Sequence, residues 1–294
     1  MTFARPDHIS DPDTLPRMPA WVTSAHAETL EDVAFLSGAA LNHLHLVLGR
    51  EDVPKALLRD RLALRAAAAC VAFTGRSERE TELRDAVHLL RPGDLPGPAG
   101  ETCQAWRRAV ERPVSIKALG RALPAFEPGQ IAAWLDAGKG LPVTRAVMVL
   151  EAVLREAPRA DVAGLIVADA ALAQALGWEH VVPLLAAALK RADLRKQGDD
   201  LRLAGHRALI SSAVEAVRLS TDLARRAAHL EAVAPKLRAK GAGDAVEMFL
   251  TRDAVAPSAL PLPDRAARRL CDRLVYLGAV RELTGRDTFR LYGV

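Results

Sequence analysis

The sequence predicts an all-α fold, in which a multi-helix domain is followed by a C-terminal winged-helix unit with a small β-hairpin. Half of the 294 residues are hydrophobic, and through most of the chain the apolar positions recur at helical spacing. Pro and Gly divide these stretches into separate helices. The last residues, 263–294, differ from the rest, because they combine one helix with two short β-prone runs. A helix followed by a hairpin is the arrangement of a winged helix.

The first part of the chain divides into a leader and a helical domain. Residues 1–26 contain Pro6, Pro12, Pro16 and Pro19, which predict an extended leader that Trp21 pins to the body. The helical domain is predicted at 27–234. Its first three helices are expected at 27–48, 54–73 and 78–90. Pro98 opens the next helix, in which Trp106 is a core anchor, and Pro128 and Pro142 open shorter helices within 115–157. A buried pair of helices is expected at 161–176 and 182–191, and a long helix at 201–234.

The winged-helix-like domain is predicted at 235–294. A basic linker at 236–243 leads to a short helix at about 244–250, and a turn or strand is expected at 255–262. A winged helix usually has its second helix at this position, and none is evident in the sequence. A minimal or degraded winged helix is therefore one of the forms that this unit could take.

The helix expected after Pro263 has one basic and one apolar face. At 100° per residue the polar arc and the apolar arc face opposite ways. The polar arc holds Arg265, Arg268, Arg269, Asp272, Arg273 and Tyr276, and the apolar arc holds Ala266, Ala267, Leu270, Cys271, Leu274 and Leu277. Asp264 is predicted to cap the N-terminus of this helix, and Gly278 to end it.

Two β-prone runs follow, at 279–283 and 288–292. The four residues Thr284-Gly285-Arg286-Asp287 between them suit a hairpin turn. Arg281, Arg286 and Arg290 are placed along this hairpin.

The distribution of charge suggests a polyanionic partner. Residues 233–294 contain 11 Lys and Arg against 7 Asp and Glu, an excess that equals the net charge of +4 of the whole chain. We therefore expect a non-enzymatic protein that binds double-stranded DNA, for example a transcriptional regulator. Arg265, Arg268, Arg269 and Arg273 would face the major groove, and Arg286 and Arg290 would neutralise phosphates. The helical domain would mediate self-association or contact a protein partner.

Two other functions stay open at this point. An Arg-rich helix face is often only a solvated surface, and winged helices also serve as protein-binding modules. A helical scaffold or adaptor is therefore the alternative, and it predicts that Arg265 to Arg273 pair with acids from residues 1–232. An enzyme with an unrecognised site is the third, with Glu179 and His180 as the pair to inspect.

Motifs for catalysis, cofactors and metals are missing from the sequence. The Gly- and Pro-rich stretch 91–100 follows no strand and has neither GK[ST] nor GxGxxG, so it is interpreted as a connection and not as a phosphate loop. His43 and His45 are two residues apart, which on a helix places them on different faces. We predict no catalytic residue, no metal and no cofactor.

The cysteines and the apolar segments favour a cytoplasmic location without a membrane partner. Cys70, Cys103 and Cys271 are odd in number and widely spaced, as expected of reduced thiols. The N-terminal residues contain no apolar signal segment. The most apolar stretch, 162–178, has Asp169 near its middle and is short for a transmembrane span.

Several stretches resemble an uncharacterised bacterial family, a domain of unknown function. They are residues 59–68 (RDRLALRAAA), 83–86 (LRDA) with the loop through Pro98-Ala99-Gly100, Trp106-Arg107, 235–243 (PKLRAKGAG), and 264–270 (DRAARRL) with the ending 290–293 (RLYG). The resemblance covers most of the chain after the leader. It implies a shared fold and brings no established activity.

A partial resemblance concerns the C-terminus. Residues 272–275 (DRLV) to 281–286 (RELTGR) are similar to the C-terminal winged helix of Fic-type adenylyltransferases. Those enzymes need an HPFxxGNGR loop, and this sequence has none. The resemblance therefore implies the accessory winged helix without nucleotidyl transfer.

Overall fold

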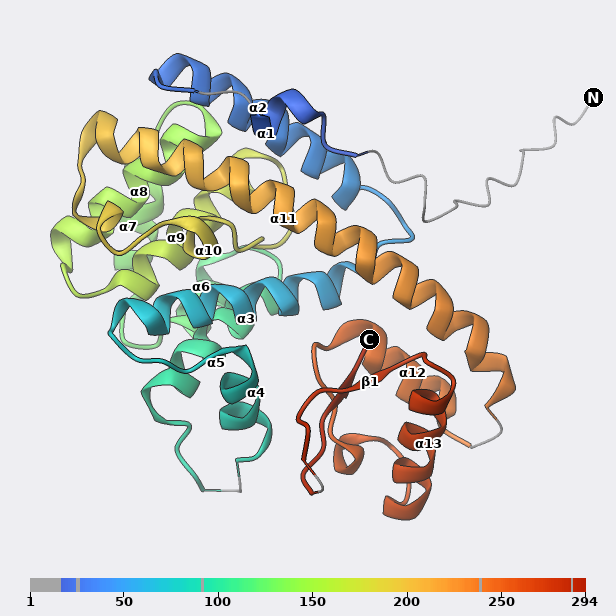
Figure 1. The fold of residues 1–294 in the computed structure, drawn as a ribbon. Coiled ribbons are helices and arrows are strands. Elements are labelled where there is room, and N and C mark those ends of the chain that lie inside the picture. The colour runs from blue at the N-terminus through green and yellow to red at the C-terminus, as the bar shows by residue number, and fades with distance from the viewer. Residues whose placement is uncertain (1–16, 25–26, 91–92, 238–239, 287) are drawn as a thin grey trace, which may run out of the picture.

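The computed structural model confirms the all-α fold, with one small antiparallel hairpin near the C-terminus (Figure 1). It describes residues 17–24, 27–90, 93–237, 240–286 and 288–294. Most of the predicted leader therefore lies outside the described residues, as do parts of the connection at 91–100 and of the linker at 236–243. No described helix combines the length and the apolar character that crossing a bilayer needs.

The N-terminal helices confirm the sequence prediction with small shifts at their ends. The prediction of an extended leader is wrong for residues 20–24, which form a helix that buries Val22 against the body. Trp21 stacks on Phe35 at 5.6 Å between ring centroids. The helices of this part are α1 (Ala20–Ser24), α2 (Leu30–Leu48), α3 (Lys55–Phe73), α4 (Glu80–His88) and α5 (Gly97–Glu111). α2 starts later than predicted because Thr29 accepts a hydrogen bond from the backbone N–H of Asp32 and so caps the helix.

Proline opens three helices of the body, as the sequence predicts. Pro98, Pro128 and Pro142 each lie in the first turn of a helix. A backbone N–H at this position has no intrahelical acceptor, so proline loses no hydrogen bond there. The helices in this region are α5, α6 (Ile116–Ala122), α7 (Pro128–Ala137), α8 (Pro142–Glu156) and α9 (Asp161–Ala175).

The predicted helix at 182–191 is wrong. Only α10 (Leu185–Ala188) forms there, and the residues just before it are outside any helix. Pro183 disfavours the helical conformation of Val182. The two side-chain oxygens of Asp169, in the middle of α9, accept the N–H groups of Leu184 and Leu185 at 3.1 Å each, so the chain turns into a helix only at this point.

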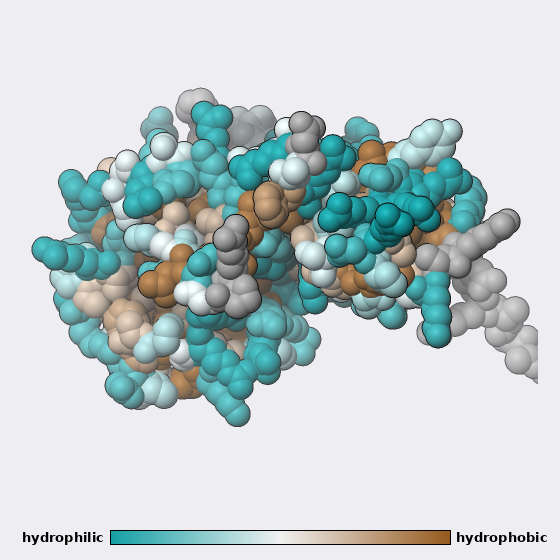
Figure 2. Space-filling view, turned by 90° about the horizontal axis from the view of Figure 1, so that it is seen from below, coloured by the Kyte–Doolittle hydropathy of each residue, from teal (hydrophilic) through white to brown (hydrophobic). Residues whose placement is uncertain are grey.

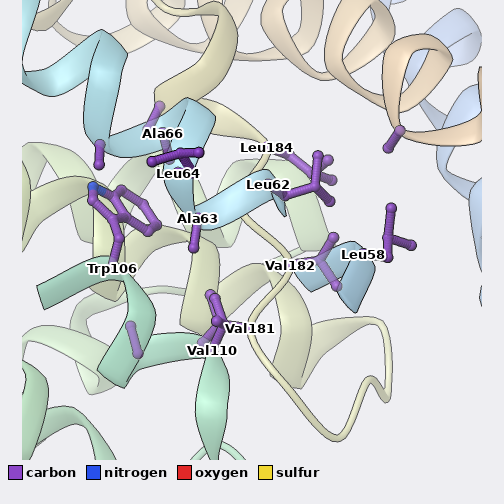
Figure 3. Close-up of a cluster of buried hydrophobic side chains, with 14 of the residues drawn as sticks. Leu58, Leu62, Ala63, Leu64, Ala66, Trp106, Val110, Val181, Val182 and Leu184 are labelled. Atoms are coloured by element: carbon purple, nitrogen blue, oxygen red, sulfur yellow. The ribbon is translucent and has the colours of Figure 1, made fainter. Parts of the chain in front are cut away.

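One part of the hydrophobic core of the body lies between α3, α5 and the segment before α10, and the same cluster continues into α2, α8, α9 and α11. Figure 3 shows Leu58 and Leu62 of α3 on the side of Val182 and Leu184. Val110 of α5 lies below them beside Val181, and Trp106 of α5 lies at the left of the view. Trp106 and Leu58 are completely buried. Burial of large apolar side chains is the main stabilising contribution to such a body.

The long helix α11 (Gly198–Val233), with 36 residues, connects the body to the C-terminal elements (Figure 1). It contacts α2, α8 and α10 along its first part, and α12 near its end. The short turns η2 (Asp193–Arg195) and η3 (Ala234–Lys236) precede and follow it. The predicted long helix is thus confirmed, whereas the proposed domain boundary after residue 234 stays a prediction.

The C-terminal unit, residues 242–294, surrounds a small sheet. Its elements are α12 (Ala242–Thr251), η4 (Pro257–Ala259), α13 (Asp264–Tyr276), β1 (Arg281–Glu282) and β2 (Tyr292–Gly293). β1 and β2 pair antiparallel, with Glu282 opposite Tyr292. On its other side Tyr292 exchanges two backbone hydrogen bonds with Val255, at 2.8 and 2.9 Å. Three chain segments therefore meet at β2.

The hairpin is confirmed, but its strands are shorter than predicted. The carboxylate of Glu282 accepts the N–H groups of Thr284 and Gly285, at 2.7 and 2.9 Å, and so occupies groups that a longer strand would pair. Of the predicted turn 284–287, Asp287 lies outside the described residues.

Candidate nucleic-acid interface

α13 has the two faces that its sequence predicts. Ala267, Leu270, Cys271 and Leu274 are buried against the C-terminal unit. On the opposite side all six predicted polar-arc residues are exposed: Arg265, Arg268, Arg269, Asp272, Arg273 and Tyr276. Seen from below, the lobe formed by the C-terminal unit has densely placed hydrophilic side chains (Figure 2).

The two ends of α13 are fixed by different means. Pro263 occupies the N-cap position and Asp264 is the first helical residue, so the prediction that Asp264 caps the helix is wrong. No side chain bonds to the first N–H groups, although a carboxylate in the first turn still stabilises the positive end of the helix dipole. Gly278 ends the helix as predicted, with φ at +68°. Its N–H donates to Val275 and that of Ala279 to Leu274, both at 2.9 Å, a Schellman motif.

The four arginines of α13 have few contacts within the protein. Arg268 lies 3.7 Å from Asp264, with both side chains more than 70% exposed, so this pair contributes little to stability. The guanidinium of Arg273 lies over the ring of Tyr276, 5.4 Å from its centroid. Among the described residues, none of these four arginines forms an ion pair with an acid from residues 1–232.

The two hairpin arginines are placed differently. Arg286 forms an ion pair with Asp85 of α4, which ties the hairpin loop to the body. The Nε of Arg290 donates to the backbone oxygen of Arg286 at 2.9 Å. The six arginines thus form two groups, one on the exposed face of α13 and one within the hairpin loop.

Nearly the whole length of the chain matches one protein family. The sequence profile of the family described as "Protein of unknown function (DUF1403)" matches residues 6–294. The chain belongs to this family. The suspected resemblance to an uncharacterised family is thereby confirmed, whereas the C-terminal resemblance to Fic-type enzymes stays a prediction. No curated protein matches the chain.

A buried charged cluster in this DUF1403 protein was missed from sequence. Asp253, directly after α12, is 4% exposed and forms ion pairs with Arg61 of α3 and Arg84 of α4. Its backbone N–H donates to Asp60, 2.9 Å away, and Asp60 in turn pairs with Arg107 at 2.9 Å. The only sequence signal was Arg-Asp-Arg at 59–61 within an otherwise apolar helix. The cluster fixes the C-terminal unit to the body.

The pair suggested for an unrecognised enzyme site is only partly buried. His180 Nδ1 lies 3.7 Å from Glu179 Oε2, but the Glu179 side chain is 74% exposed. Burial and the charge of Arg59 lower the pKa of His180. The pair borders a cavity of about 230 Å³ that His45 also lines, and His45 Nδ1 receives the indole N–H of Trp178 at 3.0 Å. Within the described part of the chain, no three His, Cys, Asp or Glu side chains are grouped as a metal site requires.

Proposed function

We propose that this protein binds double-stranded DNA through α13, as a non-enzymatic cytoplasmic protein such as a transcriptional regulator. The observation that carries the proposal is the exposed face of α13. Arg265, Arg268, Arg269 and Arg273 share this face, and no part of the described body neutralises them. A row of exposed cations that release counterions from phosphates is the usual electrostatic basis of DNA binding.

The order of elements in the C-terminal unit supports a reduced winged helix. α12, the bridge at Val255, η4, α13 and the β1–β2 hairpin follow one another as helix, short strand, second helix, recognition helix and wing do in that fold. In place of the second helix there is only η4, three residues long. The 13 residues of α13 give a helix of about 20 Å, and the major groove of about 12 Å width admits a helix.

The test is a fluorescence-anisotropy titration of random duplex DNA at two salt concentrations. The variant Arg268→Ala/Arg269→Ala should bind at least about tenfold more weakly, because each contact of this kind contributes about 1–3 kcal/mol. The slope of log K against log salt should also become shallower, because a face with two fewer cations displaces fewer counterions from the DNA.

A matched control removes the same charge from another helix. Arg218 and Arg225 lie exposed on α11, in pairs with Glu215 and Asp222. The variant Arg218→Ala/Arg225→Ala should keep the affinity and the salt slope of the unmodified protein. Equal weakening in both double variants would show that only the net charge matters and would contradict a role of α13.

A helical scaffold or adaptor is the second candidate, and the ion pair between Arg286 and Asp85 favours it. This ion pair holds the hairpin loop against α4. A wing that contacts DNA phosphates through Arg286 would first have to break it. Tyr276 and Phe289, 80% and 69% exposed, add apolar surface for a protein partner. Absence of DNA binding at low salt would make this adaptor the better proposal.

A further inference from the structure

A second basic region lies away from α13, in a cavity of about 520 Å³ between α3, α5 and the end of α12. Four arginines line it: Arg59, Arg107, Arg108 and Arg252. The acids in the lining are Asp60 and Glu111. The cavity therefore has an excess of positive charge.

The contacts within the cavity show which arginines are already neutralised. Asp60 pairs with Arg107 at 2.9 Å and also receives the N–H of Asp253, so its carboxylate is fully engaged. Arg108 donates to the side-chain oxygen of Gln104 at 3.2 Å. Among the described residues, Arg59, Arg108 and Arg252 form no ion pair, and Arg59 and Arg252 differ from Arg108 in having no side-chain hydrogen bond.

Arg59 is the less exposed of these two arginines. Its Nε is buried and has no hydrogen-bond partner. Burial lowers the pKa of Arg59, and the charge of Glu179 only partly opposes this effect. A buried guanidinium N–H without an acceptor is costly, and an anion in the cavity would supply the acceptor.

The rest of the lining fits a small molecule better than a bare ion. Ala56, Val87 and Val110 provide apolar surface, and the volume lies within the range of about 300–1,000 Å³ of small-molecule sites. His88 also lines the cavity. Its pKa is lowered to about 4 by burial and by the charge of Arg107, so it is neutral near pH 7 and available as a hydrogen-bond donor.

We propose that this cavity binds a small phosphorylated molecule, with Arg59 and Arg252 holding the phosphate. Guanidinium groups bind phosphate oxygens through paired, charge-assisted hydrogen bonds. Arg59 belongs to α3 and Arg252 follows α12, so the ligand joins the body to the C-terminal unit beside Asp253. No residue of α13 lines the cavity, and the proposal does not depend on DNA binding.

The experiment is isothermal titration calorimetry of the full chain with inorganic pyrophosphate and with glucose 6-phosphate, at constant ionic strength. We expect saturable binding of at least one of the two probes with a Kd below about 1 mM. Arg59→Gln and Arg252→Gln should each weaken it about tenfold or more, as expected for the loss of a charge-assisted hydrogen bond. Arg252 is exposed, so its variant keeps the test valid if Arg59→Gln folds poorly.

Two controls separate this site from general charge and from the DNA-binding surface. Arg155→Gln removes an exposed charge at the end of α8, outside the cavity lining, and should leave the Kd unchanged. The variant Arg268→Ala/Arg269→Ala should also keep it. Absence of saturable heat with both probes, or equal affinity in Arg252→Gln and Arg155→Gln, would overturn the proposal.

Discussion

Replacing Asp253 by Ala is expected to lower the free energy of unfolding by about 3–5 kcal/mol, the usual effect of breaking a buried ion pair from one side. The side chains of Arg61 and Arg84 are only 10% and 11% exposed. Arg84 Nε lies 2.5 Å from Asp253 Oδ2, and Arg61 also donates to the backbone oxygen of Val294 at 3.2 Å. Without the carboxylate, buried Arg61 loses its ion-pair partner, and Arg84 keeps the more distant Glu80, 3.7 Å away.

The lowered pKa of Asp253 also indicates that its carboxylate stabilises the folded state. Burial alone would raise it, but the hydrogen bond from Arg84 and the charges of Arg61 and Arg84 outweigh burial and hold it below its usual range. The folded state therefore favours the ionised form. The contribution of Asp253 to stability is present above the unfolded pKa of about 3.9 and is lost as the pH falls through the lower folded value.

Urea unfolding followed by circular dichroism measures this effect. The matched control is Asp222→Ala, which removes a carboxylate from a 35% exposed position paired with Arg225 and Arg226, and it should cost less than about 1 kcal/mol. Hydrogen exchange should in addition speed up in α12 and α13 of the Asp253→Ala protein, because the C-terminal unit loses its attachment. Equal destabilisation by the two variants would mean that the cluster does not hold the unit.

Local signals explain the parts of the fold that sequence predicted well. α11 and α13 follow from helical periodicity, α5, α7 and α8 from a proline in the first turn, and the end of α13 from Gly278. Each of these signals lies within a few residues of the element it defines. The exposed arginine face of α13 was predictable for the same reason, because the spacing of residues along a single helix determines which side chains share a face.

The parts that failed depend on residues far apart in sequence. The ion pair of Asp253 with Arg84 joins positions 169 apart, and nothing near Asp253 indicates that it is buried. The cavity around Arg59 and Arg252 likewise needs two helices to meet. The helix predicted at 182–191 failed for a partly local reason, because Pro183 disfavours a helical Val182. In addition, the side chain of Asp169 on α9 accepts the N–H groups at the start of α10.

Asp169 is also the residue for which we expect the largest effect of pH. It is 1% exposed in the middle of α9, and burial raises its pKa to about 8, although the hydrogen bonds from Leu185 and Leu184 oppose the increase. The unfolded value is about 3.9. Between these two values the folded state retains a proton that the unfolded state has lost. The protonated carboxyl therefore contributes stability that is complete below about pH 4 and is lost as the pH rises to about 8.

The variant Asp169→Asn isolates the pH dependence of this contribution, because the amide does not titrate. Its NH2 group cannot accept the N–H that the second carboxyl oxygen accepts, so the variant also loses one hydrogen bond, a cost that does not change with pH. The free energy of unfolding of the original protein should fall relative to that of Asp169→Asn by up to about 1.4 kcal/mol per pH unit between pH 5 and pH 7. The difference should level off above pH 8. Carboxylates such as Asp253 and Asp222, whose pKa values are lowered, change both proteins alike and cancel in the comparison. Urea unfolding at pH 5, 6, 7 and 8 measures this difference in the free energy of unfolding. Parallel plots of that free energy against pH for the two proteins would show that the N–H groups of Leu184 and Leu185 keep Asp169 ionised throughout.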